Sequence, residues 1–80
     1  MKPNELLALL AQDPPGLILG YVVGQNRDKP VCKIRFGAGD NIDRCTAWLK
    51  GKFCQWTGLE EKQLTVTQDL FNFTVEIKGQ

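Results

Sequence analysis

The sequence predicts an α+β fold: a two-layer sandwich in the order αββαββ, with a four-stranded, mainly antiparallel sheet covered by two helices. Two segments carry apolar residues at helical spacing, and each is followed by a pair of segments that alternate apolar and polar residues. Antiparallel hairpins with one apolar face need a cover, so we expect the helices to pack on the sheet. These patterns leave the order of the strands open.

The size and charge of the chain limit its class. Its 80 residues suit one domain, over residues 1–80, whose core is thin because a chain of this size buries only about 60–65% of its unfolded surface. The net charge is +1, from 10 Lys and Arg against 9 Asp and Glu. This balance disfavours a dedicated nucleic-acid binder, and the 42% apolar content disfavours a disordered chain.

The first half begins with a helix over residues 3–12, which has leucines at spacings of three and four and ends before Pro14-Pro15. Residues 17–23 form a strand that is apolar on both faces, which predicts a central position in the sheet. We expect a polar hairpin loop over residues 24–30. The returning strand, residues 31–36, turns alternate residues inward: Cys32, Ile34 and Phe36.

The second half begins with a helix that Asp40 or Asn41 caps and that runs to about residue 56, with Gly58 as its C-terminal cap. Strands over 64–68 and 71–77 follow. Since Phe71 and Phe73 share a face of the last strand, both are expected in the core. The residues of the helix that fall on one apolar stripe are Ile42, Cys45, Leu49, Phe53 and Trp56.

No catalytic, cofactor or metal site is expected, and we predict that the protein is not an enzyme. The sequence has no His, which removes the commonest general base and metal ligand. Its three cysteines lack the close paired spacing of a metal site, and their odd number favours reduced thiols in the cytoplasm. Cys54 lies off the apolar stripe, where Lys50 would lower its pKa and the helix end would raise it.

Two other features admit a binding function. The glycine-rich junction over residues 36–41 can be a phosphate cradle, although Asp40 would repel phosphate there, so a tight turn with a cap is the simpler explanation. Residues 27–52 have four more basic than acidic residues, so nucleic-acid binding is an alternative function. Its candidate contacts are Arg27, Lys29, Lys33 and Arg35.

The leading expectation is a small module that binds a protein or its own copy, without a membrane or metal partner. It depends on the face of the sheet that the helices leave open. That face is expected to carry Ile18, Val22, Lys33, Arg35, Thr65, Thr67, Asn72 and Thr74, with no aromatic platform for stacking bases. Trp48 lies at the boundary of the helix stripe and is an interface anchor if exposed. The candidate interface residues are Ile18, Val22, Lys33, Arg35 and Trp48.

Overall fold

The elements of the protein follow the predicted order in a computed structural model that describes residues 2–37 and 39–78. Helix α1 (Pro3–Leu10) precedes strands β1 (Ile18–Asn26) and β2 (Lys29–Phe36). Helix α2 (Ile42–Thr57) and the 3-10 turn η1 (Glu61–Gln63) lead to strands β3 (Leu64–Asp69) and β4 (Asn72–Ile77). The order αββαββ is confirmed. No helix of the described residues is long and apolar enough to cross a membrane.

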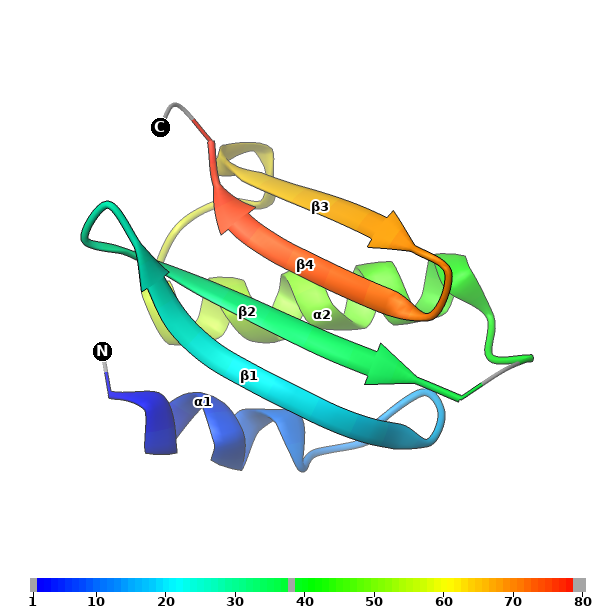
Figure 1. The fold of residues 1–80 in the computed structure, drawn as a ribbon. Coiled ribbons are helices and arrows are strands. Elements are labelled where there is room, and N and C mark those ends of the chain that lie inside the picture. Colours follow the sequence, from blue (N-terminus) through cyan, green and yellow to red (C-terminus); the bar gives the residue numbers. More distant parts are fainter. Residues whose placement is uncertain (1, 38, 79–80) are drawn as a thin grey trace.

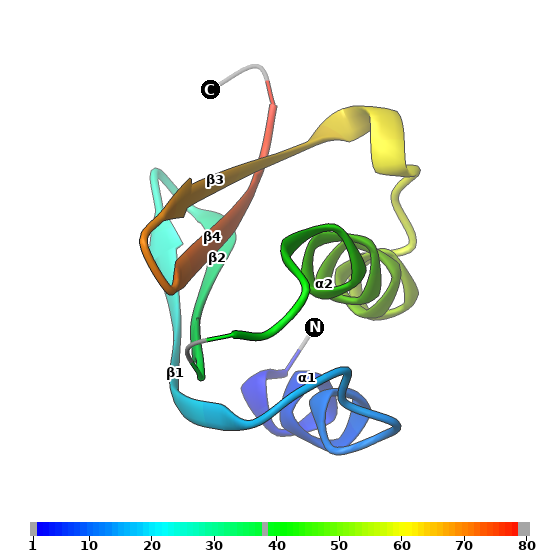
Figure 2. The ribbon, with the colours of Figure 1, turned by 90° about the vertical axis from the view of Figure 1, so that its right-hand side faces the viewer.

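The strands form one antiparallel sheet in the order β1-β2-β4-β3. Strands β2 and β4 are therefore central, and β1 and β3 are the edges. Both helices lie on the same side of the sheet, to its right in Figure 2, and α1 lies below α2 in both views. This is the predicted two-layer sandwich, and the opposite face of the sheet, which no described helix covers, is called the open face below.

The prediction that the first strand is central is wrong, because β1 has a neighbour on one side only. Strand β2 instead pairs on its other side with β4, where Ile34 lies opposite Phe73 and Cys32 opposite Val75. All four side chains are buried on the helix side. The long helix α2 thus covers the two strands that alternate strictly, and the strand with two apolar faces is left at the edge.

The first hairpin turn is shorter than the expected loop over residues 24–30. The strands continue to Asn26 and from Lys29, so only Arg27 and Asp28 lie outside them. Their φ angles of 53° and 66° are those of a two-residue type I′ turn, whose twist matches that of the paired strands. Asp tolerates this left-handed conformation better than most residues, and the sequence signal for it lacks the usual glycine.

Helix α2 begins and ends as the sequence indicates. The side chain of Asn41 accepts a hydrogen bond from the backbone N–H of Arg44 at 3.0 Å, so Asn41 rather than Asp40 is the cap. Gly58 ends the helix with φ of 78°, a conformation that glycine adopts without strain. Four of the five residues of the predicted stripe are buried. The placement of Ile42 on the buried stripe is wrong, because this first helical residue is exposed.

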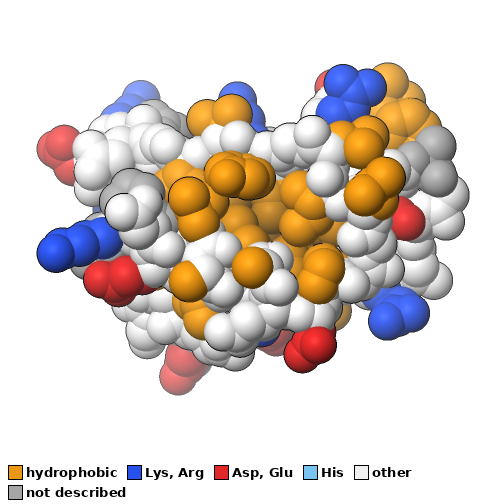
Figure 3. Space-filling view, turned by 90° about the horizontal axis from the view of Figure 1, so that it is seen from below, with side chains coloured by type: hydrophobic (Ala, Val, Ile, Leu, Met, Phe, Trp, Pro, Cys, Tyr) orange, Lys and Arg blue, Asp and Glu red, His pale blue; other side chains and the backbone are white. Residues whose placement is uncertain are grey.

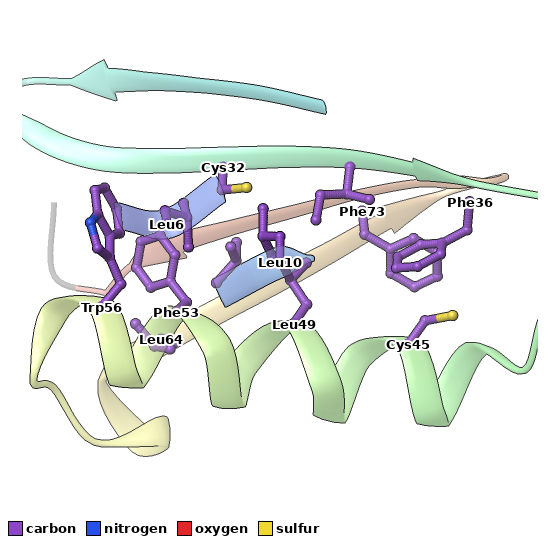
Figure 4. Close-up of a cluster of buried hydrophobic side chains, with 12 residues drawn as sticks. Leu6, Leu10, Cys32, Phe36, Cys45, Leu49, Phe53, Trp56, Leu64 and Phe73 are labelled. Atoms are coloured by element: carbon purple, nitrogen blue, oxygen red, sulfur yellow. The ribbon is translucent and has the colours of Figure 1, made fainter. Parts of the chain in front are cut away.

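The core lies between α2 and the sheet (Figure 4). Phe36 is the centre of its aromatic part, with the rings of Trp48 and Phe73 packed edge-to-face on it at centroid distances of 5.9 and 5.3 Å. The fully or almost fully buried side chains come from both helices and from three of the four strands: Leu6, Leu10, Cys32, Ile34, Phe36, Cys45, Leu49, Phe53, Trp56, Leu64, Phe73 and Val75.

Phe71 does not belong to this core, so that prediction is wrong. It lies in the two-residue turn between β3 and β4, and 41% of its surface is exposed. Strand β4 begins one residue later because Asp69 pairs with Asn72, which leaves Leu70 and Phe71 to make the turn. Only the backbone of Phe71 contributes to the sheet end, where its carbonyl accepts the N–H of Phe36 at 2.9 Å.

Two indoles on α2 hold the two ends of α1. Trp56 Nε1 donates to the carbonyl of Lys2 at 2.9 Å, before the helix, and Trp48 Nε1 donates to the carbonyl of Gln12 at 3.1 Å, after it. Lys52 Nζ lies 3.3 Å from Oε1 of the same Gln12. A helix of 8 residues is too short to be stable alone, so these contacts and the burial of its leucines keep α1 in place.

We expect Trp56→Phe and Trp48→Phe each to lower the free energy of unfolding by about 1 kcal/mol, because each variant removes an indole donor but keeps an aromatic ring. Urea unfolding measures the loss. Hydrogen exchange should accelerate more at the amides of α1 than at those of β2 and β4, which accelerate only through the loss of global stability. Equal acceleration in helix and sheet would contradict the assignment of these indoles to α1.

Candidate interaction surface

The open face of the sheet is a grid of side chains that the strand register defines. Its middle row runs across all four strands from Val22 through Lys33 and Thr74 to Thr67. Each flanking row begins at a glycine of β1. These rows are Gly20, Arg35, Asn72 and Asp69 on one side, and Gly24, Val31, Glu76 and Thr65 on the other. The face is therefore mixed and polar, and it lacks an aromatic side chain.

Three of the five predicted interface residues meet on this face: Val22, Lys33 and Arg35 are all exposed there. Val22 and Lys33 line a hollow of about 430 Å³ together with Gly24 and Val31. The other two predicted interface residues lie on the helix side of the sheet.

Ile18 is not on the open face, so its predicted position is wrong. The register of β1 with β2 shifts between Ile18 and Gly20, which makes Leu19 the extra residue of a β-bulge. Ile18 consequently lies opposite Phe36, whose side chain is buried on the helix side. A one-residue shift moves a side chain to the other face, and no residue pattern in the sequence indicates the bulge.

Trp48 is half-buried and structural. Its ring packs on Phe36, and its indole N–H donates to the carbonyl of Gln12 in the connection that follows α1. The boundary position that the sequence predicts for Trp48 is thus observed. Its ring packs on the core and its donor is bound, so Trp48 is not the free anchor that the interface hypothesis requires.

The basic candidates are spread along the first hairpin. Arg27 and Lys29 lie at or beside its turn, while Lys33 and Arg35 lie on the open face of β2. Acidic residues accompany them. Asp28 lies between Arg27 and Lys29, and Glu76 and Asp69 lie in the rows of the open face.

The surface that sequence reasoning missed lies between α1 and the edge strand β1. We call it the α1–β1 patch: the exposed Leu17, Leu19 and Tyr21 together with the residues of the adjoining groove. Exposed fractions are 66%, 56% and 54% for the three. The groove has a volume of about 290 Å³ and is lined by Leu7, Leu10, Ala11, Ile18 and Tyr21. Figure 3 shows hydrophobic side chains gathered around a hollow on this side of the molecule.

A signal for this patch was present in the sequence. Residues 17–23 are apolar on both faces, and a two-layer sandwich covers only one face of its sheet, so part of this apolar surface must remain exposed. The sequence pattern was interpreted as a central strand, whereas its position at the edge exposes the same residues. Ile18, one of the predicted interface residues, lines the groove from the helix side.

The glycine-rich junction holds no free anion cradle in the residues that the structure describes, which leave out Ala38. The carboxylate of Asp40 accepts the backbone N–H of Gly37 at 3.1 Å, so this amide already has an anionic partner. The same N–H also donates to the carbonyl of Leu17 at 2.9 Å. The N–H of Gly37 therefore links the end of β2 to the residue before β1, the carboxylate of Asp40 closes the turn that follows, and the turn explanation fits these contacts.

The three cysteines are free thiols, and two of them, Cys32 and Cys45, are buried in the core. Burial raises the pKa of Cys32 from 9.0 to about 12. The pKa of Cys45 is also raised, first by burial and then by the carboxylate of Asp40, against an opposing effect of Arg44. Both thiols are consequently protonated near neutral pH and act as small apolar side chains.

Cys54 is half-buried on α2 and packs against the core. Burial and, second, the carboxylate of Glu61 raise its pKa, and the ammonium group of Lys50 acts in the opposite direction. The net shift is upward, which disfavours a reactive thiolate. Within residues 2–37 and 39–78, no group of three or more His, Cys, Asp or Glu side chains is placed to hold a metal ion.

We expect the stability to fall in alkaline solution because of Cys32. Its pKa is about 12 in the folded protein and near 9.0 when exposed, so the unfolded chain releases a proton that the folded chain keeps. The contribution is fully present below pH about 9 and decreases by about 1 kcal/mol per pH unit as the pH rises toward the folded pKa.

Urea unfolding of the wild type and of Cys32→Ala over this pH range measures the effect. The variant loses some stability at every pH because it leaves a small cavity, but its free energy of unfolding should depend less steeply on pH. Parallel pH profiles for the two proteins would show that Cys32 does not cause the alkaline loss.

Comparisons of this chain with models of protein families, with curated proteins and with solved structures find no match. Function is therefore argued from the geometry of its surfaces. Two of the described surfaces differ in chemistry, the polar open face and the apolar α1–β1 patch.

Proposed function

We propose that this chain is a non-enzymatic interaction module that binds a protein through the α1–β1 patch. The observation that carries the proposal is the exposure of Leu17, Leu19 and Tyr21 next to an apolar groove. Soluble monomers seldom expose a large contiguous apolar surface, and such patches with polar surroundings mark sites of interaction. The three free thiols support a reducing, cytoplasmic compartment.

A protein fits this patch better than a small molecule does. The residues that line the groove offer apolar contacts and the Tyr21 ring, with no charged group to orient a small ligand. The exposed side chains also extend along β1 beyond the groove, so a ligand confined to the groove would leave them in water. Aromatic and aliphatic residues without charges are typical of the centre of a protein interface.

The sequence contains no His, and all three thiols have raised pKa values, which supports a function without acid–base or thiolate catalysis. Variants that test the interface must change side chains that do not pack on the core. Alanine at Ile18 or Trp48 is expected to weaken folding, since both pack on the core, whereas the exposed leucines are free of that role.

We expect Leu19→Asp to abolish binding and to change the free energy of unfolding by less than about 1 kcal/mol, because Leu19 is exposed and lies in a bulge. A photo-cross-linking amino acid at position 19 or 17, in an extract of the source cells, should form protein adducts that excess wild-type chain suppresses and excess Leu19→Asp variant does not.

The matched control carries the same cross-linker at Thr67, which is exposed on the opposite edge strand. Adducts at positions 19 and 67 in equal yield would mean non-specific contact, and no adduct at either 17 or 19 would refute the proposal.

Nucleic-acid binding is the second candidate, and a specific observation favours it. Lys29, Lys33 and Arg35 are all exposed on β2. Lys33 and Arg35 lie on the open face, and Lys33 lines two hollows there. Phosphate contacts of this kind would make binding fall steeply with salt. The open face has no aromatic side chain on which bases could stack, so the α1–β1 patch is the stronger basis for a function.

We expect Lys33→Glu together with Arg35→Glu to leave the binding of the protein partner intact. If the chain binds single-stranded nucleic acid at low salt, the same double variant should weaken that binding at least about tenfold, as measured by fluorescence anisotropy. Salt-dependent binding of nucleic acid that this variant abolishes would favour the nucleic-acid function. If the wild type binds no nucleic acid at low salt, that function is excluded.

A further inference from the structure

Strand β1 has the composition of a central strand and the position of an edge strand. Its residues, Ile18–Asn26, include no charged residue and no proline. Sheets usually protect such an edge with charges, proline or a short strand, because its unpaired backbone can pair with another chain. The other edge, β3, is protected in this way: it has 6 residues, and its last three, Thr67, Gln68 and Asp69, are polar and exposed.

The backbone groups of β1 that lack a partner follow from the hairpin turn. In a two-residue hairpin, the residues that flank the turn, here Asn26 and Lys29, exchange both backbone hydrogen bonds, and every second residue repeats this pairing. The intervening residues, Tyr21, Val23 and Gln25, therefore direct their N–H and C=O groups away from β2. This part of the strand keeps a regular register from Gly20 to Asn26, so it can accept a further strand.

We propose that β1 pairs antiparallel with β1 of a second copy of this chain across a two-fold axis, which joins two four-stranded sheets into one continuous sheet. This inference rests on the proposed protein-binding function and names its partner. Two observations favour a second copy over a different protein: the absence of charge along β1 and the amount of apolar surface beside it.

The absence of charge makes β1 self-complementary. When a strand pairs with its own copy about a two-fold axis, each charged residue near the axis meets a like charge, which destabilises the pair. Strand β1 has no such residue to oppose. The pairing is also closed, because each copy uses the same edge, so the assembly stops at the dimer while the polar β3 edges remain outside.

Exposed apolar surface lies on both faces of β1. Val22 is 63% exposed on the open face, and the α1–β1 patch lies on the helix side of the same strand, so pairing covers apolar surface on both faces. Specific interfaces bury on the order of 1,000 Å² or more in total, and the pairing would use apolar surface on both faces of β1 in each copy. The grooves beside the two α1 helices would then lie next to each other across the axis.

Light scattering on the purified full chain tests the proposal, with a mass near twice 9.0 kDa expected at about 50 µM. The disrupting variant is Val22→Glu. Its carboxylate lies opposite Lys33 within the sheet, which favours the fold, but near the axis it faces the same charge of the second copy. We expect this variant to be folded and to dissociate into monomers at the concentration where the wild type is a dimer.

The matched control is Thr67→Glu, at the other end of the same cross-strand row on the β3 edge. It should remain a dimer. Hydrogen exchange gives an independent readout: the amides of Tyr21, Val23 and Gln25 should exchange slowly in the dimer and at least about tenfold faster in the Val22→Glu monomer.

The outcomes separate this inference from the proposed function. A monomeric wild type overturns the inference, and if cross-linking at Leu19 still captures another protein, the proposed function holds with a different partner. A dimer that Val22→Glu leaves intact also overturns it, because the interface then lies elsewhere. A dimer that dissociates only in Val22→Glu, with protection at the three amides, supports it.

Discussion

The burial of one helical stripe against two central strands is the constraint on which the rest of this structure depends. Cys45, Leu49 and Phe53 of α2 are fully buried, and the strands beneath them, β2 and β4, turn their alternate residues toward the helix. Such a contact removes apolar surface from water on both partners, and in a chain of 80 residues there is little other core to replace it. The pairing of β2 with β4 follows from it, and so does the placement of the two hairpins.

The shorter helix depends on the longer one. Two indoles of α2 hold the ends of α1, and the leucines of α1 complete the core next to them. Helix α1 has only 8 residues and does not cover all of the apolar surface of β1, so a groove remains between the two elements. The apolar surface of β1 is therefore a consequence of how few residues the chain has for a second layer. If β1 does pair with a second copy, the partner would provide the cover that the chain lacks.

The two exposed surfaces differ in chemistry and support different partners. The open face mixes Lys33 and Arg35 with threonines and carboxylates, a surface that water solvates well. The α1–β1 patch has no charged residue and lies beside unpaired backbone groups. Contact with a protein would remove its apolar surface from water, which is favourable. The patch is the stronger candidate for function because exposing its apolar surface to water is unfavourable in free energy, whereas the polar open face is well solvated.

The sequence by itself determined the elements, their order and most of the core. Periodicity places Cys45, Leu49 and Phe53 on one stripe, and the caps at Asn41 and Gly58 are recognisable because they depend on nearby residues alone. It also placed Lys33 and Arg35 on the open face correctly. Local patterns are sufficient for these features, since each depends on residues within a turn of helix or a few residues of strand.

Only the tertiary structure decided which strand lies at the edge, on which face Ile18 lies, and that Phe71 is exposed. Each depends on a contact between distant segments or on a shift of one residue in the register. The apolar pattern of β1 is the same whether the strand is central or at an edge, and its neighbours are chosen by how the hairpins pack under α2. The α1–β1 patch exists because this strand order leaves an apolar strand uncovered at the edge of the sheet. The periodicity of the sequence carries no information on strand order.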